Sequence, residues 1–246
     1  MNKIQIKNFI NRFPLIKNFI FYFRPPSLKF DLYGYKNRIF FSNQLIESKI
    51  EGDILDIGSG LIINGNTKGL SLEIMERRKT LDYINNPGVD IVGSVLDLPI
   101  PDSSVAGVLF QGVIEHIGSP EKAISEIYRV LKPGGYLYVE APFLQHFHYD
   151  PEDNYRFTDD GLETIFSNQD FHIIKKGSLY GPSAVLADVI IEYISIFFRF
   201  NIIYWILKWV FGWLLFWIKY LDILFINNKN SKYLSLGVFI IGKKND

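Results

Sequence analysis

The chain has 246 residues, of which 48% are hydrophobic and 21% charged, and its formal net charge is zero. This length and apolar content suffice for one sizeable core with additions. A neutral chain has no overall basic field, so no nucleic-acid partner is expected, and the lack of cysteine excludes disulfides, thiolate nucleophiles and zinc–cysteine sites.

Residues 1–30 combine basic and apolar side chains without any acidic residue. Such a segment can lie on an anionic membrane surface, to which each Lys or Arg contributes about 1 kcal/mol. It can equally pack as an extension over the rest of the chain. Arg12, Pro14 and Lys17 interrupt any apolar run, which argues against a signal peptide.

A helix is expected over residues 33–48, and the stretch after it is the centre of the chain. A short buried strand, residues 54–57, runs into the turn Gly58-Ser59-Gly60. Glycine lets the backbone approach a ligand without a side chain in the way, and the carboxyl end of a strand in an open α/β sheet faces the crevice where ligands bind. With Asp56 close to its tip, this strand therefore ends at a predicted ligand site.

From residue 54 onward, predicted strands and helices alternate, which is typical of a parallel sheet with right-handed crossovers. The helix over residues 119–131 has the clearest signals: Ser119 can cap it, Pro120 stands where a missing amide is harmless, and Pro133-Gly134-Gly135 stops it. Further strands are predicted at 80–82, 89–92, 105–110, 136–140, 171–175 and 234–242.

Several short motifs stand at the ends of these elements. They are Lys79-Thr80-Leu81-Asp82, Asp97-Leu98-Pro99, Gln111-Gly112 with Glu115-His116, and Lys132-Pro133-Gly134-Gly135. In this order, residues 51–171 resemble the class I S-adenosylmethionine-dependent methyltransferases, in the type 11-like group that includes glycan-pathway enzymes. The resemblance implies an α/β fold with a Rossmann-like seven-stranded sheet whose last strand is antiparallel, and S-adenosylmethionine as the cofactor.

The resemblance also implies roles for the matching residues. Asp56, Gly58 and Gly60 would hold the methionine part of the cofactor, and Asp82 would accept hydrogen bonds from the ribose hydroxyls. Asp97 with Leu98 would contact the adenine edge, while Gln111 and Gly112 would line the floor under the sulfonium.

The chain departs from the family pattern at residues 61–69, which are too broken by Gly and Asn for a helix. The carboxylate end of the cofactor is therefore expected to be held differently. A Rossmann dehydrogenase fits less well, because the Gly-x-Gly-x-x-Gly fingerprint fails at Ile63.

Residues 141–158 resemble a segment found in a subset of these methyltransferases. The matching positions are His148, Pro151, Asp153, Tyr155, Arg156, Phe157 and Thr158. Because this loop follows the strand whose tip faces the cofactor, its side chains can reach the methyl group. The candidate catalytic residues are His148, Arg156 and Tyr155: an imidazole can take a hydroxyl proton at neutral pH, and a guanidinium can hold an anionic acceptor.

Other interpretations of this loop stay open. His146 is a weaker candidate base, and Asp153 and Arg156 can pair simply to fold the loop, with Thr158 capping a helix over 159–167. Glu115 and His116 are interpreted as structural residues that tie the loop down. A metal at His146, His148 and Asp150 is conceivable by ligand type, but nothing fixes its geometry, so no metal is expected.

Residues 183–225 are dominated by large apolar side chains and predict two apolar helices with thin polar stripes. One stripe holds Asp188, Glu192 and Arg199, and the other holds Asn201, Lys208, Gly212 and Lys219. A single membrane crossing would place the final β-strand on the opposite side of the membrane from the rest of the sheet. Two crossings would require a span that contains Asp188, Glu192 and Arg199, and burying three charges in a membrane is costly. We expect helices that lie in the membrane interface, or a shallow hairpin, with Trp205, Trp209, Trp213 and Trp217 at headgroup depth; a dimer interface or a lid is the alternative.

The predicted organisation is an N-terminal extension (1–50), a methyltransferase core (51–182), an apolar helical insert (183–230) and the final core strand (231–246). The leading hypothesis is methyl transfer to a hydroxyl or carboxylate of a glycan-related or amphiphilic acceptor, either a small molecule or a lipid-linked glycan, by a cytoplasmic protein peripheral on the inner membrane face. A lipid or quinone-like acceptor comes second. A catalytically silent methyltransferase fold that acts as a membrane-binding or partner-binding module comes third, since Asp56, Asp82 and Asp97 together argue for a working cofactor site.

Overall fold

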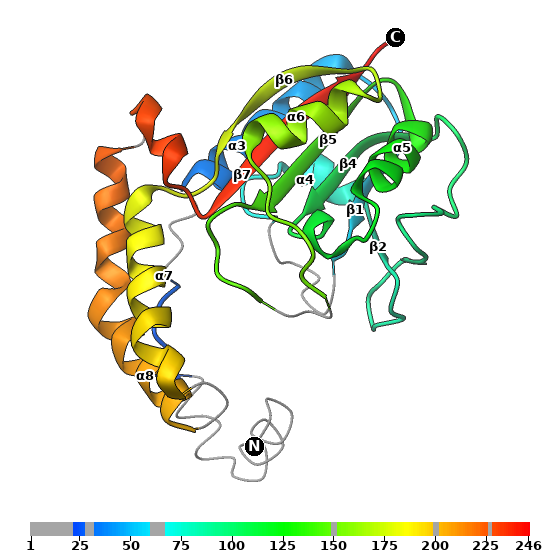
Figure 1. Cartoon of the computed structure of the whole chain (residues 1–246). Helices are drawn as coiled ribbons and strands as arrows, with labels where there is room; N and C mark the ends of the chain where they lie inside the picture. Colours follow the sequence, from blue (N-terminus) through cyan, green and yellow to red (C-terminus); the bar gives the residue numbers. More distant parts are fainter. Residues whose placement is uncertain (1–21, 28–31, 60–66, 149–151, 199–201, 226–227) are drawn as a thin grey trace. The chain divides into compact units, whose positions relative to one another are not determined.

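The computed structural model describes residues 22–27, 32–59, 67–148, 152–198, 202–225 and 228–246 (Figure 1). The chain divides into two units. The core unit is Asp31–Tyr180 with Ser235–Asp246, and the helical unit is Met1–Phe30 with Gly181–Leu234. The predicted insert at 183–230 falls within the helical unit, whereas residues 31–50, predicted as part of the extension, belong to the core unit.

The described part of the core unit is built on a seven-stranded sheet with the order β3-β2-β1-β4-β5-β7-β6. Its strands are β1 (Ile54–Ile57), β2 (Arg78–Asp82), β3 (Ile91–Val92), β4 (Val105–Gln111), β5 (Leu131–Pro142), β6 (Phe171–Ser178) and β7 (Gly237–Lys244). The first five pair in parallel, and β7 runs antiparallel between β5 and β6. The predicted fold class, with its antiparallel last strand, is confirmed.

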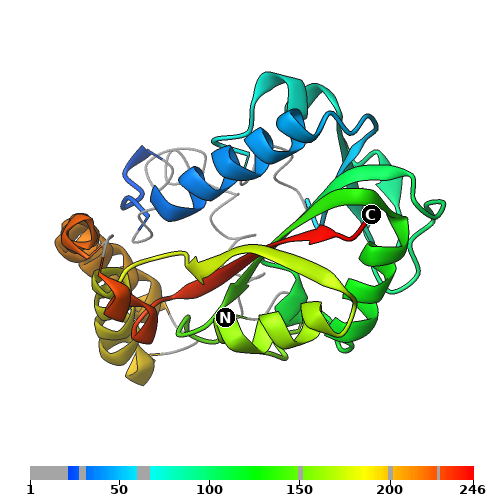
Figure 2. The same cartoon turned by 90° about the horizontal axis from the view of Figure 1, so that it is seen from above.

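Helices cover both faces of this sheet (Figure 2). One face carries α3 (Leu32–Ser48) and α4 (Leu72–Glu76), and the other carries α5 (Pro120–Val130) and α6 (Asp159–Ser167). Neighbouring strand residues alternate between two apolar clusters: Ile54 packs with Phe41 and Leu45 of α3, while Leu55 belongs to the cluster that includes Ile127 of α5. This alternation follows from the two-residue period of a strand.

Two local expectations around α5 and β5 are wrong. The Ser119 side chain makes no capping hydrogen bond, although Pro120 does open the helix. The Pro133-Gly134-Gly135 stretch does not separate helix from strand, because β5 already begins at Leu131, which pairs with Val105. The stretch instead forms an irregularity in the strand, where the register shifts and Gly134 takes φ +74°.

The helix α6 begins and ends where the sequence places it. Thr158 takes extended backbone, and its Oγ1 accepts a hydrogen bond from the Gly161 N–H at 3.0 Å. This satisfies one of the unpaired donors of the first turn, as a Thr N-cap does. Between β4 and α5 lies a short 3-10 helix, η1 (Ile114–His116).

A fully buried arginine, Arg38 of α3, joins several elements of the core unit. Its Nη1 lies 3.1 Å from Oε1 of Glu140 in β5 and 3.4 Å from Oε1 of Gln111 in β4, and its Nε donates to the Lys68 carbonyl oxygen at 2.7 Å. Tyr138 donates a further hydrogen bond to Glu140. The buried carboxylate thus has both a charge partner and hydrogen-bond donors, which is the condition for burying an ion pair.

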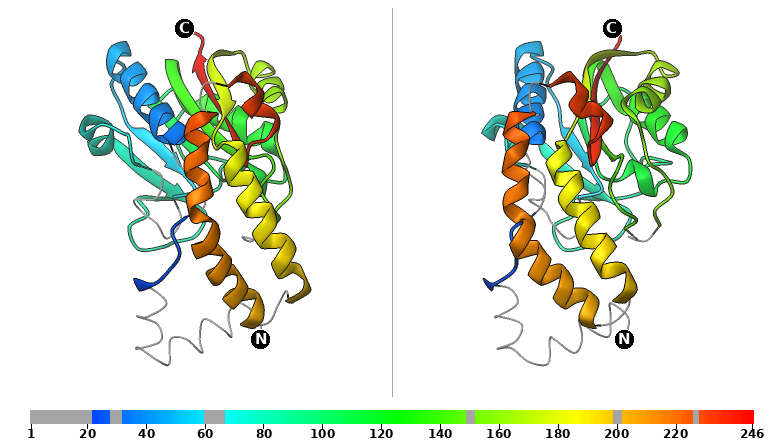
Figure 3. Two further views of the ribbon diagram at one scale, coloured as in Figure 1. Left: turned by 90° about the vertical axis from the view of Figure 1, so that its left-hand side faces the viewer. Right: turned by 60° about the vertical axis from the view of Figure 1, so that its left-hand side comes forward.

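The described helical unit contains α7 (Pro182–Ser195), η2 (Ile196–Phe198), α8 (Ile202–Leu215), η3 (Phe216–Leu224) and η4 (Lys229–Tyr233). The helices α7 and α8 lie side by side (Figure 3). Of the two predicted polar stripes, Arg199 and Asn201 lie outside the described residues. Within the described residues, no helix combines the length and apolar character needed to cross a membrane.

The polar groups of the helical unit pair with one another. Glu192 of α7 forms an ion pair with Lys208 of α8, and Nζ of the buried Lys219 donates to the Ser27 carbonyl oxygen at 2.6 Å. The buried carboxylate of Asp222 accepts hydrogen bonds at 2.8 and 3.2 Å from the first N–H groups of α7. Burial lowers the pKa of Lys208, but the bonds to Glu192 and Tyr204 outweigh it and raise that pKa.

Replacement of Arg38 tests the buried ion pair. Arg38→Met leaves the Glu140 carboxylate buried without its charge partner, so the free energy of unfolding should fall by about 3–5 kcal/mol in urea titrations followed by circular dichroism. The control Lys176→Met breaks a largely exposed pair with Asp160, and its effect should stay within about 1 kcal/mol. Equal losses in the two variants would contradict the importance of the buried pair.

Candidate active site

The turn after β1 approaches the end of β4 closely. Gly58 takes φ +74°, and a Cβ built on it would lie 2.3 Å from Cγ2 of Val113, so this position requires glycine. The Gly58 N–H donates to the Leu81 carbonyl oxygen of β2 at 2.8 Å. The next residue, Ser59, has a buried Oγ that finds no hydrogen-bond partner within the described part of the chain. Gly60 and residues 61–66 lie outside the described residues.

Asp56 is placed inside the sheet rather than in the turn. Its carboxylate oxygen Oδ2 accepts from Nε of Arg78 at 2.7 Å and pairs with Nη2 at 2.5 Å. Burial raises the pKa of Asp56, while Arg78 acts in the opposite direction. The carboxylate therefore has a cationic partner of its own within the protein, and its contact with a cofactor stays a prediction.

Asp82 and the Gln111-Gly112 pair stand at the carboxyl ends of β2 and β4, on the same edge of the sheet as Gly58. Asp82 is buried, and its Oδ1 accepts from the Ile84 N–H at 2.9 Å. Gly112 is exposed at φ +65°, and its N–H donates to the Glu140 carbonyl oxygen at 2.9 Å. The structure thus brings together three of the predicted cofactor-binding segments.

Asp97 and Leu98 lie on a loop that α5 holds in place. The Leu98 N–H donates to Glu126 at 3.0 Å, and its carbonyl oxygen accepts from Nη2 of Arg129 at 3.0 Å. Nη1 of Arg129 also bonds the Ile100 carbonyl oxygen at 2.9 Å. The Leu98 backbone is occupied within the protein and its side chain is buried in the apolar core, so its contact with adenine stays a prediction, while Asp97 is exposed.

Arg156 on the loop after β5 is fully engaged within that loop. Two of its donors bond the buried Asp153 carboxylate at 2.5 and 2.6 Å, and the others bond the carbonyl oxygens of Gln145, His146 and Tyr155. These contacts use all five N–H groups of a guanidinium. The hydrogen bonds from Arg156 to the Asp153 carboxylate lower the pKa of Asp153 to about 2. The predicted pairing of Asp153 and Arg156 is present, and an anionic acceptor would have to displace one of these bonds.

Tyr155 and its neighbour Asn154 attach the loop to η1. The N–H groups of both residues donate to the Glu115 carbonyl oxygen at 3.2 and 2.9 Å, and the Tyr155 hydroxyl donates to the Gly118 carbonyl oxygen at 3.3 Å. His116 adds a contact from its Nδ1 to the Glu152 carbonyl oxygen. Glu115 and His116 do tie this loop down, but partly through their backbone. Asp150 and Pro151 lie outside the described residues.

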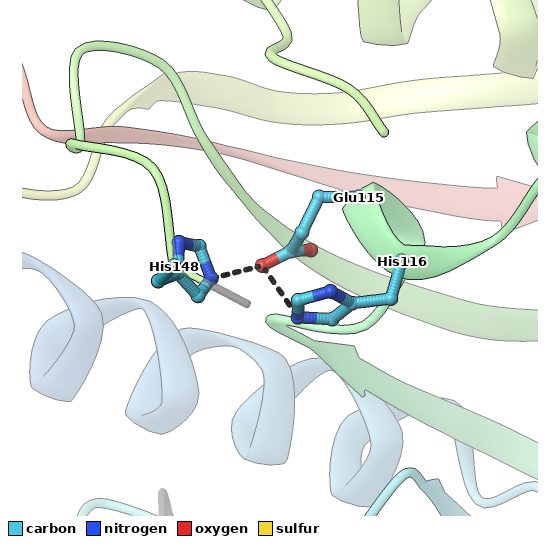
Figure 4. Close-up of side chains that lie close together, drawn as sticks. All are labelled: Glu115, His116 and His148. Carbon is cyan, nitrogen blue, oxygen red and sulfur yellow. Dashed lines mark ion pairs between the residues drawn. The ribbon is translucent and has the colours of Figure 1, made fainter. Parts of the chain in front are cut away.

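His148 turns toward Glu115 and His116 (Figure 4). Its Nε2 lies 3.7 Å from Oε1 of Glu115, and its ring packs edge-on against that of His116 with centroids 5.3 Å apart. The nearby Glu115 carboxylate raises the pKa of His148 against the opposing effect of burial, with Asp153 contributing in the same direction. His146 contributes its backbone carbonyl to this loop.

The contacts of the Glu115 side chain are not signalled by the sequence, in which Glu115 and His116 are both interpreted as structural residues. Its side chain is 4% exposed and meets two imidazoles, one of which is more than thirty positions away in the chain. No local spacing signals such a contact. The adjacency of Glu115 and His116 shortly after the end of β4 is the hint that the sequence offers.

Comparisons with known proteins agree with this geometry. Residues 67–139 match the model of a methyltransferase domain family. A probable S-adenosylmethionine-dependent methyltransferase of Mycolicibacterium smegmatis is 36% identical over 100 residues, which are 37% of this chain and 38% of that protein. A demethylmenaquinone methyltransferase of Symbiobacterium thermophilum is 34% identical over 83 residues, 33% of each chain. The matched segments thus cover little more than a third of these relatives' length.

Among solved structures, a Haemonchus contortus phosphoethanolamine N-methyltransferase 2 in complex with S-adenosyl-L-methionine has a TM-score of 0.51 and 17% identity, covering 85% of this chain and 53% of that one. At this identity the likeness concerns the fold. Residues 67–139 therefore carry a methyltransferase domain, and the order of the seven strands is that of the class I S-adenosylmethionine-dependent methyltransferases, which this part of the chain resembles.

Proposed function

We propose that this protein transfers a methyl group from S-adenosylmethionine to a hydroxyl or carboxylate of a glycan-related or amphiphilic acceptor at a membrane surface. The observation that carries the methyl-transfer part is the convergence of Gly58-Ser59, Asp82 and Gln111-Gly112 at one edge of the sheet. In an open α/β sheet, this edge is where ligands bind.

The residues at this edge fit the cofactor. The Ser59 Oγ is buried without a partner, so a ligand group can supply the missing hydrogen bond. The glycines at 58 and 112 keep side chains away from the backbone, and the Asp82 carboxylate can accept from ribose hydroxyls. When bound, the cofactor supplies an electrophilic methyl group on a sulfonium.

The loop after β5 lines the proposed binding site for the acceptor. Arg156 and Asp153 fix its shape, and Tyr155 holds it to η1. Positioning accounts for much of the rate of a direct displacement. A carboxylate acceptor forms its bond to the methyl group without losing a proton, whereas a hydroxyl must release one. His148, Arg156 and Tyr155 stay predictions as catalytic residues.

The membrane part of the proposal rests on the surface of the helical unit. Exposed apolar side chains recur at steps of three or four residues along both helices: Leu186, Val189 and Tyr193 on α7, and Ile203, Ile206, Val210 and Leu214 on α8. Such spacing gives each helix one apolar face. Meanwhile Glu192, Lys208 and Asp222 pair inside the unit. Apolar side chains are thus exposed while charged groups pair inside, and this arrangement suits contact with lipid. The basic residues of 1–30 suit anionic headgroups.

A quinone-like acceptor is the second candidate. It is favoured by the same apolar faces and by the likeness to a demethylmenaquinone methyltransferase. Quinone and glycan acceptors differ in the atom methylated, so the product distinguishes them.

Calorimetric titration with S-adenosylmethionine tests the cofactor site. Asp82→Ala should weaken binding roughly 10- to 100-fold, since a hydrogen bond to a charged group contributes about 1.5–3 kcal/mol. The control Asp53→Ala removes an exposed carboxylate at the opposite end of β1 and should leave affinity unchanged. Absence of binding to the folded wild-type protein would refute the cofactor proposal.

Transfer of radiolabelled methyl groups to a membrane lipid extract tests the acceptor. The label should appear in an amphiphilic product. Mild alkali should release it from a methyl ester but not from a methyl ether, which separates carboxylate from hydroxyl acceptors. Label confined to a quinone carbon, or to molecules that are neither glycan-related nor amphiphilic, would exclude the leading acceptor class.

Flotation with vesicles of phosphatidylglycerol and phosphatidylethanolamine tests the membrane contact. Leu214→Glu should lower partitioning at least about 10-fold, because burial of one Leu side chain contributes about 1.5–3 kcal/mol. The matched control Leu72→Glu alters a leucine of the core unit that is 83% exposed, against 57% for Leu214, and should leave partitioning unchanged. Equal losses in both variants, or a wild-type protein that does not float, would contradict lipid contact by this face.

A further inference from the structure

Three side chains beside η1 bring one potential ligand atom each to a common point (Figure 4). Oε1 of Glu115 lies 3.8 Å from Nε2 of His116 and 3.7 Å from Nε2 of His148, and the three atoms are all within 4.8 Å of one another. Two imidazole nitrogens and one carboxylate oxygen form the ligand set of several zinc and non-haem iron centres.

The contact made by Nδ1 of His116 determines the tautomer of this ring. Nδ1 of His116 contacts the Glu152 carbonyl oxygen, which can only accept a hydrogen bond, so Nδ1 is the protonated nitrogen. In the neutral ring, Nε2 then directs a lone pair toward Glu115. A hydrogen bond from one ring nitrogen to a carbonyl oxygen is the usual support of a metal-binding histidine.

The His148 ring has the same surroundings. Its Nδ1 lies 3.3 Å from the His146 carbonyl oxygen and 3.6 Å from the Asp153 carboxylate, and both are acceptors. The Gln145 side-chain amide, 3.4 Å away, can present its oxygen or its nitrogen. Protonation at Nδ1 again leaves the Nε2 lone pair facing Glu115.

The carboxylate at the centre lacks sufficient partners of its own. Glu115 is 3% exposed, and among the residues that the structure describes its Oε2 has no hydrogen-bond partner. A buried anion that faces two nitrogen lone pairs is strongly unfavourable unless a cation lies between them. Arg156 interacts with Glu115 electrostatically, and an added proton or a metal ion at this point would supply the cation that lies directly between the carboxylate and the imidazoles.

We propose that Glu115, His116 and His148 bind a divalent transition-metal ion of the Zn²⁺ class. With bonds of about 2.0–2.2 Å, neighbouring ligand atoms of a tetrahedral zinc lie roughly 3.4 Å apart, so small side-chain rotations close the gaps to Glu115. A single carboxylate is too few oxygens for Ca²⁺, and imidazole nitrogen suits zinc better than Mg²⁺. Three protein ligands leave a position open for water or an acceptor oxygen. The proposal does not rest on methyl transfer.

The competing arrangement is a His148 imidazolium paired with Glu115 and no metal. Metal and proton compete for the same Nε2 lone pair, so binding of the ion releases a proton. The two arrangements differ in whether the protein takes up a metal stoichiometrically.

Titration of the chelator-treated full-length protein with Zn²⁺ distinguishes them. Calorimetry should show one ion per chain, and Co²⁺ should produce visible absorption bands that Zn²⁺ abolishes. Glu115→Gln and His148→Gln should each weaken Zn²⁺ binding at least about 10-fold, since loss of even an outer partner of a zinc ligand costs 10- to 100-fold. The variant His116→Gln tests the second imidazole ligand separately from Glu115, its neighbour on η1.

The matched control is His172→Gln, which removes an exposed histidine on β6 and should leave the affinity unchanged. Circular dichroism in chelator establishes that each variant is folded. A folded wild-type protein that binds no Zn²⁺ and gives no Co²⁺ bands would overturn the proposal, as would an equal loss in His172→Gln. S-adenosylmethionine binding, measured on the same samples, reports separately on the cofactor site.

Discussion

The buried pairing of Arg38 with Glu140 connects the parts of the core unit that form the edge of the sheet where the cofactor is predicted to bind. Arg38 comes from a helix before the first strand, yet it reaches the ends of β4 and β5 and the carbonyl oxygen of Lys68 ahead of α4. Because a charge in this position is tolerated only with its partners in place, it fixes the relative positions of these segments. Glu140 in turn receives the Gly112 N–H on its carbonyl oxygen, so the pair and the predicted cofactor floor share one residue.

Elements with local signals were predictable from the sequence. Thr158 followed by two acidic residues defines the start of α6, and the run 54–57 before a glycine turn defines β1. Where a local signal competed with strand pairing, the pairing prevailed: Pro133-Gly134-Gly135 reads as a stop, but Leu131 already pairs with Val105. The family resemblance supplied the position of β7, which no local pattern determines.

The candidate site was predictable at the level of segments and not of contacts. Gly58, Asp82 and Gln111 follow strands that lie parallel, so their common edge follows from topology. The partners of individual charges do not: Asp56 meets Arg78 from the next strand, and Glu115 meets His148 from a loop beyond the following helix and strand. Such pairs depend on side-chain directions that only the folded chain fixes.

The sheet order has a consequence for how the chain folds. β7 is the only partner of β6 within the described sheet, and it enters between β5 and β6 after the entire helical unit has been synthesised. During synthesis, one edge of β5 therefore stays unpaired while the helical unit, the most apolar part of the protein, is being made. Long-range pairing of this kind is slow and leaves strand edges open to association with other chains.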